Sequence, residues 1–378
     1  MVSSCSATDL MGRGLWGILP GMAKVPGTSL VMHPAVARDV LTREHGDRLR
    51  RICRFVPSPG PAPAMITEDD DGVGRLPIVQ DIAELLPQAL EIEVLVTSWG
   101  CPKLDRETIE SLPRLRLIAH MGDTVKGFID DLAWRRGILV SHAAAAAAIP
   151  VAEYALAAIL LANKGAFVLE RRYASHRDFD PSTLHGDPTH RASVGNYQRT
   201  VGVIGASHVG RKLLGLLAPR DLKVVLYDPY IAPSDARALG AVKMGLNEVL
   251  AKSDVVSLHA PLLEDTHHLI GASELAQLRD GATLINTAQG ALIDPDALEA
   301  ELLSGRLNAI LDVTEPQPLV QTSPLFELPN VFLTPQLSGS LGAEIHRFGD
   351  VILDELERYA RGAGLKHLVR RDQLARMA

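Results

Sequence analysis

One stretch near the middle of the chain, residues 200–228, constrains the fold more than any other. It begins with a short apolar run, Thr200–Ile204, that is typical of a buried strand. A loop with two glycines follows, then the helix-forming residues 209–217 and a second strand-like run, Lys223–Tyr227. Strand, tight loop, helix and strand in this order form the repeating unit of a parallel sheet. We therefore predict an α/β fold around a parallel sheet.

The loop of this unit reads Gly205-Ala-Ser-His-Val-Gly210 and differs from the GxGxxG fingerprint at Ser207. Gly205 permits the tight turn, and Gly210 lets helix and strand approach closely. The helix behind the loop directs its free N–H groups and its positive dipole end to the place where a pyrophosphate would lie. Ser207 is small enough for this place, and its hydroxyl can donate a hydrogen bond to phosphate. Taken alone, the loop is a weak motif.

Asp228 strengthens the interpretation because it follows the second strand, about twenty residues after the loop. A carboxylate at this place binds the adenosine ribose hydroxyls and repels a 2′-phosphate. The sequence therefore predicts NAD rather than NADP as the cofactor. The alternative is that Asp228-Pro229 is a plain turn.

The rest of the chain continues the alternation of strands and helices. Its 378 residues exceed the size of a single core, so we expect two domains. In the first half we predict strands at 29–32, 54–57, 93–97, 116–120 and 137–141, helices at 35–50, 79–90, 106–112 and 128–136, and a surface loop at 57–75. In the second half we predict strands at 255–259, 282–286, 309–312 and 331–333, helices at 233–239, 246–251 and 294–304, and an amphipathic helix at 341–361 that packs back on the first domain.

The two halves are joined by an apolar segment. Six alanines, Ala143–Ala148, stand shortly before Pro150. Because proline suits the first helical turn, we predict a helix that Pro150 opens and that runs from Val151 to Lys164. The apolar run Ile149–Asn163 is interrupted by two polar residues, and we expect it to be too short to span a bilayer. Residues 171–198 are polar and predict a loop-rich crossing.

Charge and cysteine usage narrow the choice of partners. The formal net charge of −7 repels nucleic acid and anionic membranes, so we expect neither as a partner. The cysteines Cys5, Cys53 and Cys101 lie far apart without a CxxC pair, which predicts no disulfide framework and no metal site. The first thirty residues do not have the pattern of a signal peptide, so we expect a cytoplasmic protein. We also expect no metal at the irregularly spaced His176, His185 and His190.

These motifs resemble those of the D-isomer-specific 2-hydroxyacid dehydrogenase family. The first half matches loosely, at Ile149–Glu153 and in the loops Trp99-Gly100 and Met121–Thr124. The second half matches in the family's order at Thr200–Gly210, Leu226–Pro229, Ser257–Leu262 with Thr266, Gly281–Asp294, Leu311–Pro318 and Asn330–Gly339.

The resemblance implies an α/β fold with two Rossmann-like domains. A flavodoxin-like substrate domain would be formed by both chain ends, residues 1–148 and 342–378. An NAD-binding Rossmann domain, residues 149–341, would be inserted between them. The resemblance also implies a homodimer formed through the NAD domain and a small-molecule substrate.

In this family three side chains carry out the chemistry. An arginine in an Asn-Thr-x-Arg-Gly motif binds the substrate carboxylate, and a histidine in a Thr-Pro-His motif exchanges a proton with the substrate oxygen. A glutamate pairs with that histidine. The resemblance assigns these three positions to Gln289, Gln336 and Gln317, respectively. Formate dehydrogenases of the same fold also have glutamine at the position of Gln317, but they keep the arginine and the histidine.

The glutamines change what the site can do. Glutamine cannot take up or release a proton near neutral pH, and it lacks the charged fork of arginine. General acid–base catalysis contributes roughly 10²–10⁴-fold, so we expect ordinary 2-oxoacid reduction to be very slow. Neutral glutamines can instead hydrogen-bond to one another without a buried charge.

The resemblance also implies roles for other residues. Asp312 would hold the nicotinamide carboxamide, and His120 or Lys126 is a candidate replacement acid or cation. Asp123, His142 and Tyr154 are further candidates, His259 is expected to pack at a strand end, and Glu315 is the neighbour of the catalytic position rather than that position itself. The substrate loops would contain Trp99, Gly100, Met121, Gly122, Asp123 and Thr124. The cofactor would contact Gly205, Ser207, His208, Val209, Gly210, Asp228, Pro229, Ala260, Pro261, Thr266, Thr287, Ala288, Asp312, Ser338 and Gly339.

Three functional hypotheses remain open at this point. The favoured one is a diverged NAD-dependent oxidoreductase with unusual chemistry or a substrate without a carboxylate. The second is a catalytically silent NAD(H)-binding protein that acts as a sensor or binding partner, as transcriptional corepressors of this fold do. The third is that the glutamines were introduced deliberately to inactivate a dehydrogenase.

Overall fold

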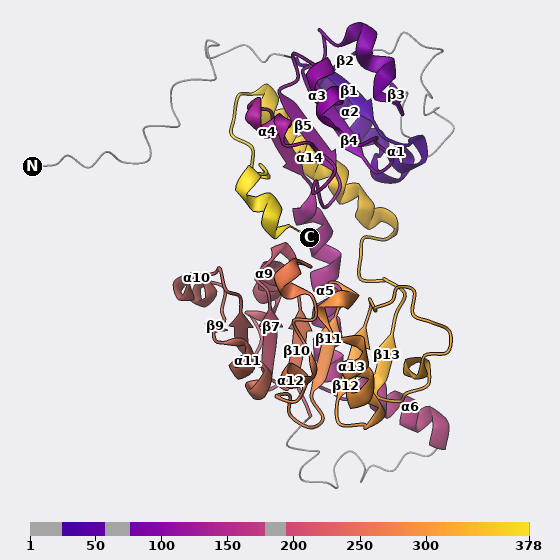
Figure 1. The fold of residues 1–378 in the computed structure, drawn as a ribbon, viewed down its shortest axis with the longest axis vertical. Coiled ribbons are helices and arrows are strands. Elements are labelled where there is room, and N and C mark those ends of the chain that lie inside the picture. Colours follow the sequence, from indigo (N-terminus) through magenta and orange to yellow (C-terminus); the bar gives the residue numbers. More distant parts are fainter. Residues whose placement is uncertain (1–24, 57–75, 178–193, 378) are drawn as a thin grey trace, which may run out of the picture. The chain divides into compact units, whose positions relative to one another are not determined.

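The computed structural model describes residues 25–56, 76–177 and 194–377, and these form two compact units (Figure 1). The first unit comprises the residues up to Ala143 together with His346–Arg371. The second comprises Ala144–Ile345 and the residues from Asp372 onward. The first division lies after Ala143, the first alanine of the run, because the rest of the run belongs to a helix of the second unit. Of the predicted features, Cys5, His185, His190 and the whole of the loop 57–75 lie outside the described residues.

The first unit contains a parallel sheet of six strands in the order β2-β1-β4-β5-β6, with β3 also paired to β1. Apart from β3, this is the 2-1-3-4-5 order of flavodoxin-like sheets. The five strands predicted in this half are confirmed, and β3 is an additional one. The strands are β1 (Gly27–Val31), β2 (Arg54–Phe55), β3 (Ile78–Val79), β4 (Val94–Ser98), β5 (Leu117–Met121) and β6 (Leu139–His142).

The C-terminal helix of the first unit packs against its N-terminal part, as predicted. This helix, α14 (His346–Ala360), lies on α2 and β5. Its buried Glu355 accepts a hydrogen bond from Ser141 at 3.2 Å, and Tyr359 donates one to Glu93 at 2.9 Å. The other helical segments of the unit are α1 (Pro34–Val40), α2 (Arg43–Ile52), the 3₁₀ helix η2 (Ile82–Gln88), α3 (Arg106–Ser111) and α4 (Leu132–Arg135).

Two helix predictions in this unit are wrong. The single helix predicted at 35–50 is two helices, because Thr42 caps α2 by accepting a hydrogen bond from the backbone of His45 at 3.3 Å. The segment 79–90 forms a short strand followed by a 3₁₀ helix rather than an α-helix, since Pro87 lies inside it and cannot donate to an α-helical carbonyl. The helix predicted at 128–136 is confined to Leu132–Arg135.

The second unit contains a parallel sheet of seven strands in the order β13-β12-β11-β10-β7-β8-β9. The chain crosses from one side of β7 to the other between β9 and β10, so the strand order reverses there, as in doubly wound dinucleotide-binding folds. The six strands predicted in this half are confirmed, and β9 is an additional one. The strands are β7 (Thr200–Ile204), β8 (Lys223–Tyr227), β9 (Val242–Lys243), β10 (Val255–Leu258), β11 (Thr283–Asn286), β12 (Asn308–Leu311) and β13 (Val331–Leu333).

Successive side chains of these strands enter two separate cores, one on each face of the sheet. Val224 and Leu226 of β8 pack on one face, whereas Val225 between them packs on the other. This period of two, with both faces apolar, is what a parallel sheet covered by helices requires. The helices are α5 (Ala144–Ala162), α6 (Ala166–His176), α9 (His208–Leu217), α10 (Pro233–Ala238), α11 (Leu246–Lys252), α12 (Ala272–Leu275) and α13 (Pro295–Leu303).

Helix α5 is longer than predicted, and its length decides whether it could cross a membrane. It begins at Ala144 rather than at Pro150, because alanine favours helix strongly, and Pro150 lies inside it. With 19 residues and a mean hydropathy of 1.9, α5 is long and apolar enough to cross a membrane by length and composition alone, contrary to the expectation that the run is too short. Core helices of soluble proteins pass the same test, and α5 packs on α9, β10 and β11.

Candidate cofactor and active site

The two glycines of the loop after β7 are each required by close backbone contacts. Gly205 has a φ of +98°, and a Cβ atom there would lie 2.5 Å from the backbone nitrogen of Ala260. A Cβ atom on Gly210 would lie 2.0 Å from the carbonyl oxygen of Gly205. Neither distance can be relieved by a side-chain rotation, because both contacts are with backbone. The loop therefore has the close-packed geometry that the fingerprint predicts.

Ser207 takes the place of the middle glycine without strain. Its φ of −63° suits any residue, and it is the N-cap of α9. Its Oγ accepts a hydrogen bond from the backbone N–H of Gly210 at 3.3 Å, so its own proton is still available to a phosphate. The N-terminus of α9 thus keeps the free N–H groups that a pyrophosphate needs.

Asp228, directly after β8, fastens the glycine loop to the neighbouring strand. Its Oδ2 accepts a hydrogen bond from the backbone of Ala206 at 2.7 Å. Its Oδ1 accepts from the backbones of Tyr230 and Ile231 at 2.8 and 3.0 Å, so the turn that was the alternative interpretation is present. These three hydrogen bonds use three of the about four lone-pair sites of the Asp228 carboxylate. One site remains for a ribose hydroxyl, so the carboxylate can both hold the turn and bind the cofactor.

The other predicted cofactor residues follow the carboxyl ends of adjacent strands. Ala260, Pro261 and Thr266 come after β10, and Thr287 and Ala288 come after β11. Carboxyl ends of parallel strands meet at one edge of the sheet, where ligands of such folds bind. The Thr287 hydroxyl is buried there without a hydrogen-bond partner. A buried polar group usually has one, so this orphaned hydroxyl fits a bound cofactor.

Asp312, after β12, is more fully occupied than its predicted role suggests. Its Oδ1 accepts hydrogen bonds from the Thr334 hydroxyl at 2.6 Å and from the backbone of Leu337 at 2.7 Å. Its Oδ2 accepts from both the backbone and the hydroxyl of Ser338. Four donors fill a carboxylate, so Asp312 holds the segment after β13 in place. Its contact with a carboxamide stays a prediction.

Tyr154 of α5 extends this network. Its hydroxyl lies 2.8 Å from Thr334 Oγ1, and because Thr334 donates its only proton to Asp312, Tyr154 is the donor. Burial, followed by the nearby charge of Asp312, raises the pKa of Tyr154, although the bond to Thr334 acts in the opposite direction. The phenol therefore stays protonated and acts as a hydrogen-bond donor within the structure.

Two of the three glutamines lie next to each other. Gln317 Nε2 donates a hydrogen bond to Gln336 Oε1 at 3.2 Å, and both side chains are exposed. Gln336 has a φ of +59°, in the left-handed region. Gln289 stands on the loop after β11, where the adjacent Gly290 lies against the backbone of Thr314, so the loops of Gln289 and Gln317 are in contact. Sequence reasoning passed over Gly290, although a glycine just past a strand end was the available signal.

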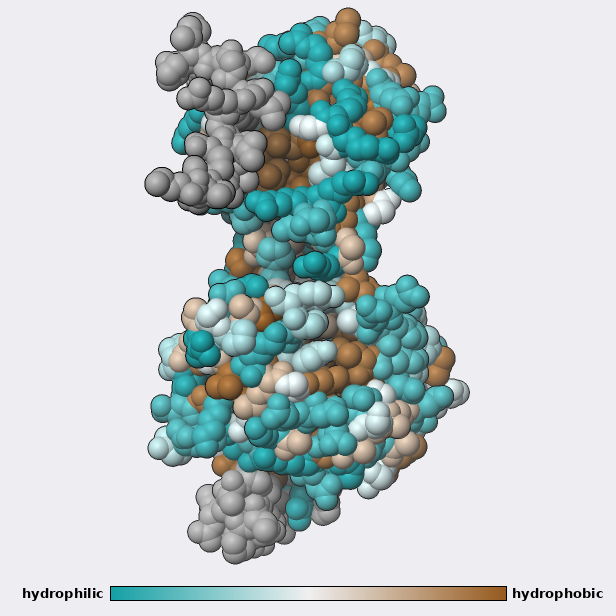
Figure 2. Space-filling view, turned by 60° about the vertical axis from the view of Figure 1, so that its left-hand side comes forward, coloured by the Kyte–Doolittle hydropathy of each residue, from teal (hydrophilic) through white to brown (hydrophobic). Residues whose placement is uncertain are grey.

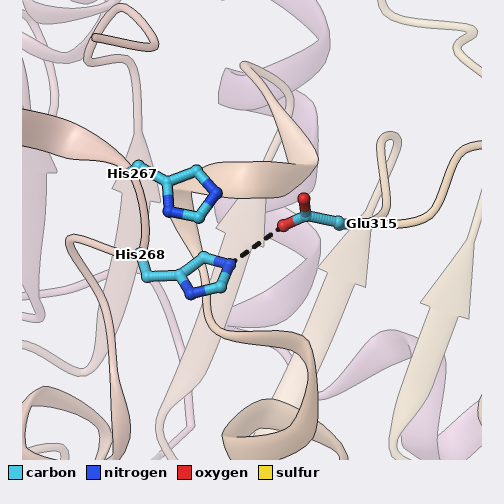
Figure 3. A group of neighbouring side chains, drawn as sticks. All are labelled: His267, His268 and Glu315. Carbon is cyan, nitrogen blue, oxygen red and sulfur yellow. Dashed lines mark hydrogen bonds and ion pairs between the residues drawn. The ribbon is translucent and has the colours of Figure 1, made fainter. Parts of the chain in front are cut away.

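Glu315 contacts a histidine from another loop. Its Oε2 lies 3.1 Å from Nε2 of His268, and the rings of His267 and His268 are stacked beside it (Figure 3). The register argument that separates Glu315 from the catalytic position stays a prediction. His259, also discussed from the sequence, is buried; its Nε2 lies 2.8 Å from Ser257 Oγ, and burial lowers its pKa to about 3.

In the first unit, the predicted substrate loops follow two adjacent strands, β4 and β5. His120 ends up in the core of that unit: its side chain is buried, its Nδ1 lies 2.9 Å from Thr97 Oγ1, and its ring packs on Phe128. Burial, followed by the charge of His142, lowers the pKa of His120 to about 4, so it is neutral at pH 7. Of the remaining residues, Asp123, Lys126 and Trp99 are exposed, whereas Met121 and Gly122 are buried.

Together, the strand order, the glycine loop and Asp228 define a dinucleotide-binding α/β protein with a second flavodoxin-like unit. Comparison with known proteins gives the family. Residues 157–338 match the domain described as "D-isomer specific 2-hydroxyacid dehydrogenase, NAD binding domain". The chain belongs to the D-isomer-specific 2-hydroxyacid dehydrogenase family, and NAD is the cofactor of the matched domain.

Individual relatives support this assignment. The chain is 30% identical over 286 residues to the (S)-sulfolactate dehydrogenase of Chromohalobacter salexigens. The aligned region covers 74% of this chain and 89% of that protein. The chain is also 31% identical over 277 residues to D-3-phosphoglycerate dehydrogenase of Mycobacterium leprae. The aligned region covers 73% of this chain and 51% of that protein, so the chain spans about half the length of this relative. The TT0316 protein of Thermus thermophilus has a similar fold, with a TM-score of 0.62, 27% identity and coverage of 91% of this chain and all of that one.

Proposed function

We propose that this chain is an NAD-dependent oxidoreductase whose own hydride transfer does not rely on an acid–base pair at the family's catalytic positions. The hydrogen bond from Gln317 to Gln336 carries this proposal. Two neutral amides bind each other where the family has an ionisable pair, while the glycine loop keeps its cofactor geometry. The chain would therefore keep the use of NAD but not the usual proton transfer.

The same residues suggest the class of substrate. NAD, when bound, accepts or supplies the hydride. Gln289 has no charge, so a substrate carboxylate would lack the charge-assisted hydrogen bonds that an arginine provides. The named relatives are dehydrogenases of hydroxy acids with a sulfonate or phosphate group. We propose instead a small molecule that has no charge where it contacts Gln289, or one that gives up a hydride without transferring a proton.

The test compares the natural chain with the variant Gln289→Arg/Gln317→Glu/Gln336→His. The 3.2 Å separation of the two amides suits a carboxylate–imidazole hydrogen bond, and a left-handed φ is tolerated by histidine. NADH oxidation is followed across a panel of small 2-oxo acids and of carbonyl compounds without a carboxylate. We expect the variant to reduce 2-oxo acids roughly 10²–10⁴-fold faster than the natural chain.

The outcomes separate the hypotheses. If the natural chain already reduces 2-oxo acids as fast as the variant, the assignment of the glutamine positions is wrong. If the natural chain binds NADH but turns over no compound of the panel while the variant does, the catalytically silent NAD(H)-binding hypothesis is favoured. NADH affinity is measured for both proteins, so that loss of the cofactor is not mistaken for loss of chemistry.

We further propose a homodimer that works in the cytoplasm without nucleic-acid or membrane partners. The net charge of −7 and the cysteines Cys53 and Cys101, which form no disulfide, support this setting. In the second unit, helices α5 and α6 expose Leu161, Val168 and Tyr173, apolar side chains that a second copy could cover. Figure 2 shows hydrophobic residues, in brown, among the hydrophilic residues on the face of the molecule that it draws. Light scattering in solution that gives the mass of one chain would contradict the dimer.

A further inference from the structure

Three side chains of metal-binding types gather beside the residues predicted to contact the cofactor, but are not among them. His267 and His268 stand between the 3₁₀ turn η3 (Glu264–Thr266) and α12, and Glu315 stands on the loop after β12. The two imidazole rings are stacked with centroids 3.9 Å apart, and Nε2 of His268 lies 3.1 Å from Oε2 of Glu315. One ligand atom from each residue lies within 4.8 Å of the others, and Figure 3 shows the three side chains converging.

The backbone brings the two histidines to the same side. His268 has a φ of +51°, a left-handed conformation that is unfavourable for a residue other than glycine. Its backbone N–H donates to the carbonyl of Ala291 at 2.8 Å, which holds this conformation. As a result, consecutive side chains that would point apart in a strand are stacked, and both rings stand next to Glu315.

We propose that His267, His268 and Glu315 bind one divalent transition-metal ion of the zinc class. Two imidazole nitrogens and a carboxylate oxygen are a known zinc donor set that leaves a fourth position open to water. Metal–ligand bonds of about 2.0–2.2 Å place tetrahedral ligands about 3.3–3.5 Å apart, so the largest separation must shrink by roughly 1.5 Å. His267 is exposed and can rotate to do this.

An ion pair between His268 and Glu315 is the simpler interpretation. Both side chains are about one-third exposed, at 35% and 36%, and a pair of that kind contributes little to the stability of a protein. Such a pair does not require His267. A metal ion uses all three side chains, which is why their convergence favours it.

The place of this group gives the ion a structural consequence. Glu315 stands two residues before Gln317, on the loop that Gly290 contacts. The Glu315 side chain is about one-third exposed, so an ion can reach it from solvent. A bound ion would fasten the segment before α12 to the loop that carries Gln317. This proposal does not depend on the chemistry of the glutamine pair.

The experiment measures Zn²⁺ binding to the untagged, chelator-treated full chain by competition with a chromophoric chelator, and Co²⁺ binding by visible absorption. The natural chain is compared with His267→Ala and Glu315→Gln, with His367→Ala as a matched control that removes a histidine of the other unit. We expect one equivalent of Zn²⁺ and at least about tenfold weaker binding in each of the two site variants, with the control unchanged. NADH affinity, measured in parallel, shows that each variant is folded.

The proposal is overturned if the natural chain binds no stoichiometric Zn²⁺ at micromolar concentrations. It is also overturned if the two site variants bind Zn²⁺ as tightly as the natural chain, or if His367→Ala weakens binding as much as they do. A Co²⁺ complex that keeps its absorption spectrum in Glu315→Gln would show that the carboxylate is not a ligand and would likewise contradict the site.

Discussion

The cofactor loop and the catalytic loops of the second unit lie along the same sheet edge but differ in what determines them. At the glycine loop, backbone atoms touch backbone atoms, and Gly205 and Gly210 admit no side chain. At the loops predicted to be catalytic, Gln317 and Gln336 are exposed and bind each other through their side chains. Backbone packing therefore constrains the residue type in the first region, whereas exposed side chains are less constrained in the second.

The local structure is compatible with the proposed separation of cofactor use from the usual proton transfer. Asp312 holds the segment that carries Gln336 through four hydrogen bonds from Thr334, Leu337 and Ser338, none of which involves the glutamine. An ionisable side chain at that position is therefore not needed for the local structure. The predictions below test whether the two regions are as independent as this arrangement implies.

The largest effect is expected from a matched pair of glycine substitutions in α9. Gly210→Ala places a Cβ 2.0 Å from the Gly205 carbonyl, so the loop must move. Overpacking of this kind costs about 1–3 kcal/mol, which corresponds to roughly five- to 150-fold in NADH affinity if the loop must recover its geometry to bind the cofactor. Gly215→Ala, on the same helix with nothing within 4 Å, should leave NADH affinity unchanged and stabilise the chain by about 0.5–1 kcal/mol. Equal NADH affinities in the two variants would show that the loop is not the cofactor site.

The glycine positions also show what a sequence can reveal. Strands with both faces apolar, the glycine loop and Asp228 follow from local patterns, and the structure places them as predicted. The break between α1 and α2 was missed because the cap by Thr42 competes with a continuous helical pattern.

Contacts between residues distant in sequence could not be foreseen. The contact of His268 with Glu315 joins positions 47 residues apart, and no local pattern indicates it. The network of Tyr154, Thr334 and Asp312 is similar: each residue was visible in the sequence, but their connection depends on how α5 packs on the sheet.

A second prediction tests whether His120 has taken over the role of the missing acid. Its pKa of about 4 lies below the value of about 6.5 for an unfolded histidine, so the unfolded chain binds more protons between these values. Stability should therefore fall as the pH drops from about 6.5 towards 4, by about 2 kcal/mol at about pH 5. His120→Asn should remove this part of the pH dependence.

The measurement is denaturant unfolding at several pH values, followed by tryptophan fluorescence. All three tryptophans precede residue 144, so the signal comes from the part of the chain that contains His120. His259, whose pKa is lowered in the same direction, is present in both proteins and cancels in the comparison. Parallel pH profiles for the natural chain and His120→Asn would mean that His120 is not buried in the neutral form, and its role as a replacement acid would regain support.

The smallest effect is expected at Tyr154, another candidate acid. Tyr154→Phe removes one hydrogen bond to Thr334 while Thr334 continues to donate to Asp312, so we expect a loss of about 1 kcal/mol in unfolding free energy. Because burial raises the pKa of the phenol, this loss should be the same at neutral and mildly alkaline pH. Thr334→Val removes both bonds and should cost more, since Asp312 loses a donor. If Tyr154→Phe instead abolishes NADH turnover without a change in stability or NADH affinity, the proton transfer has moved to α5, and the catalytic region is rebuilt rather than neutral.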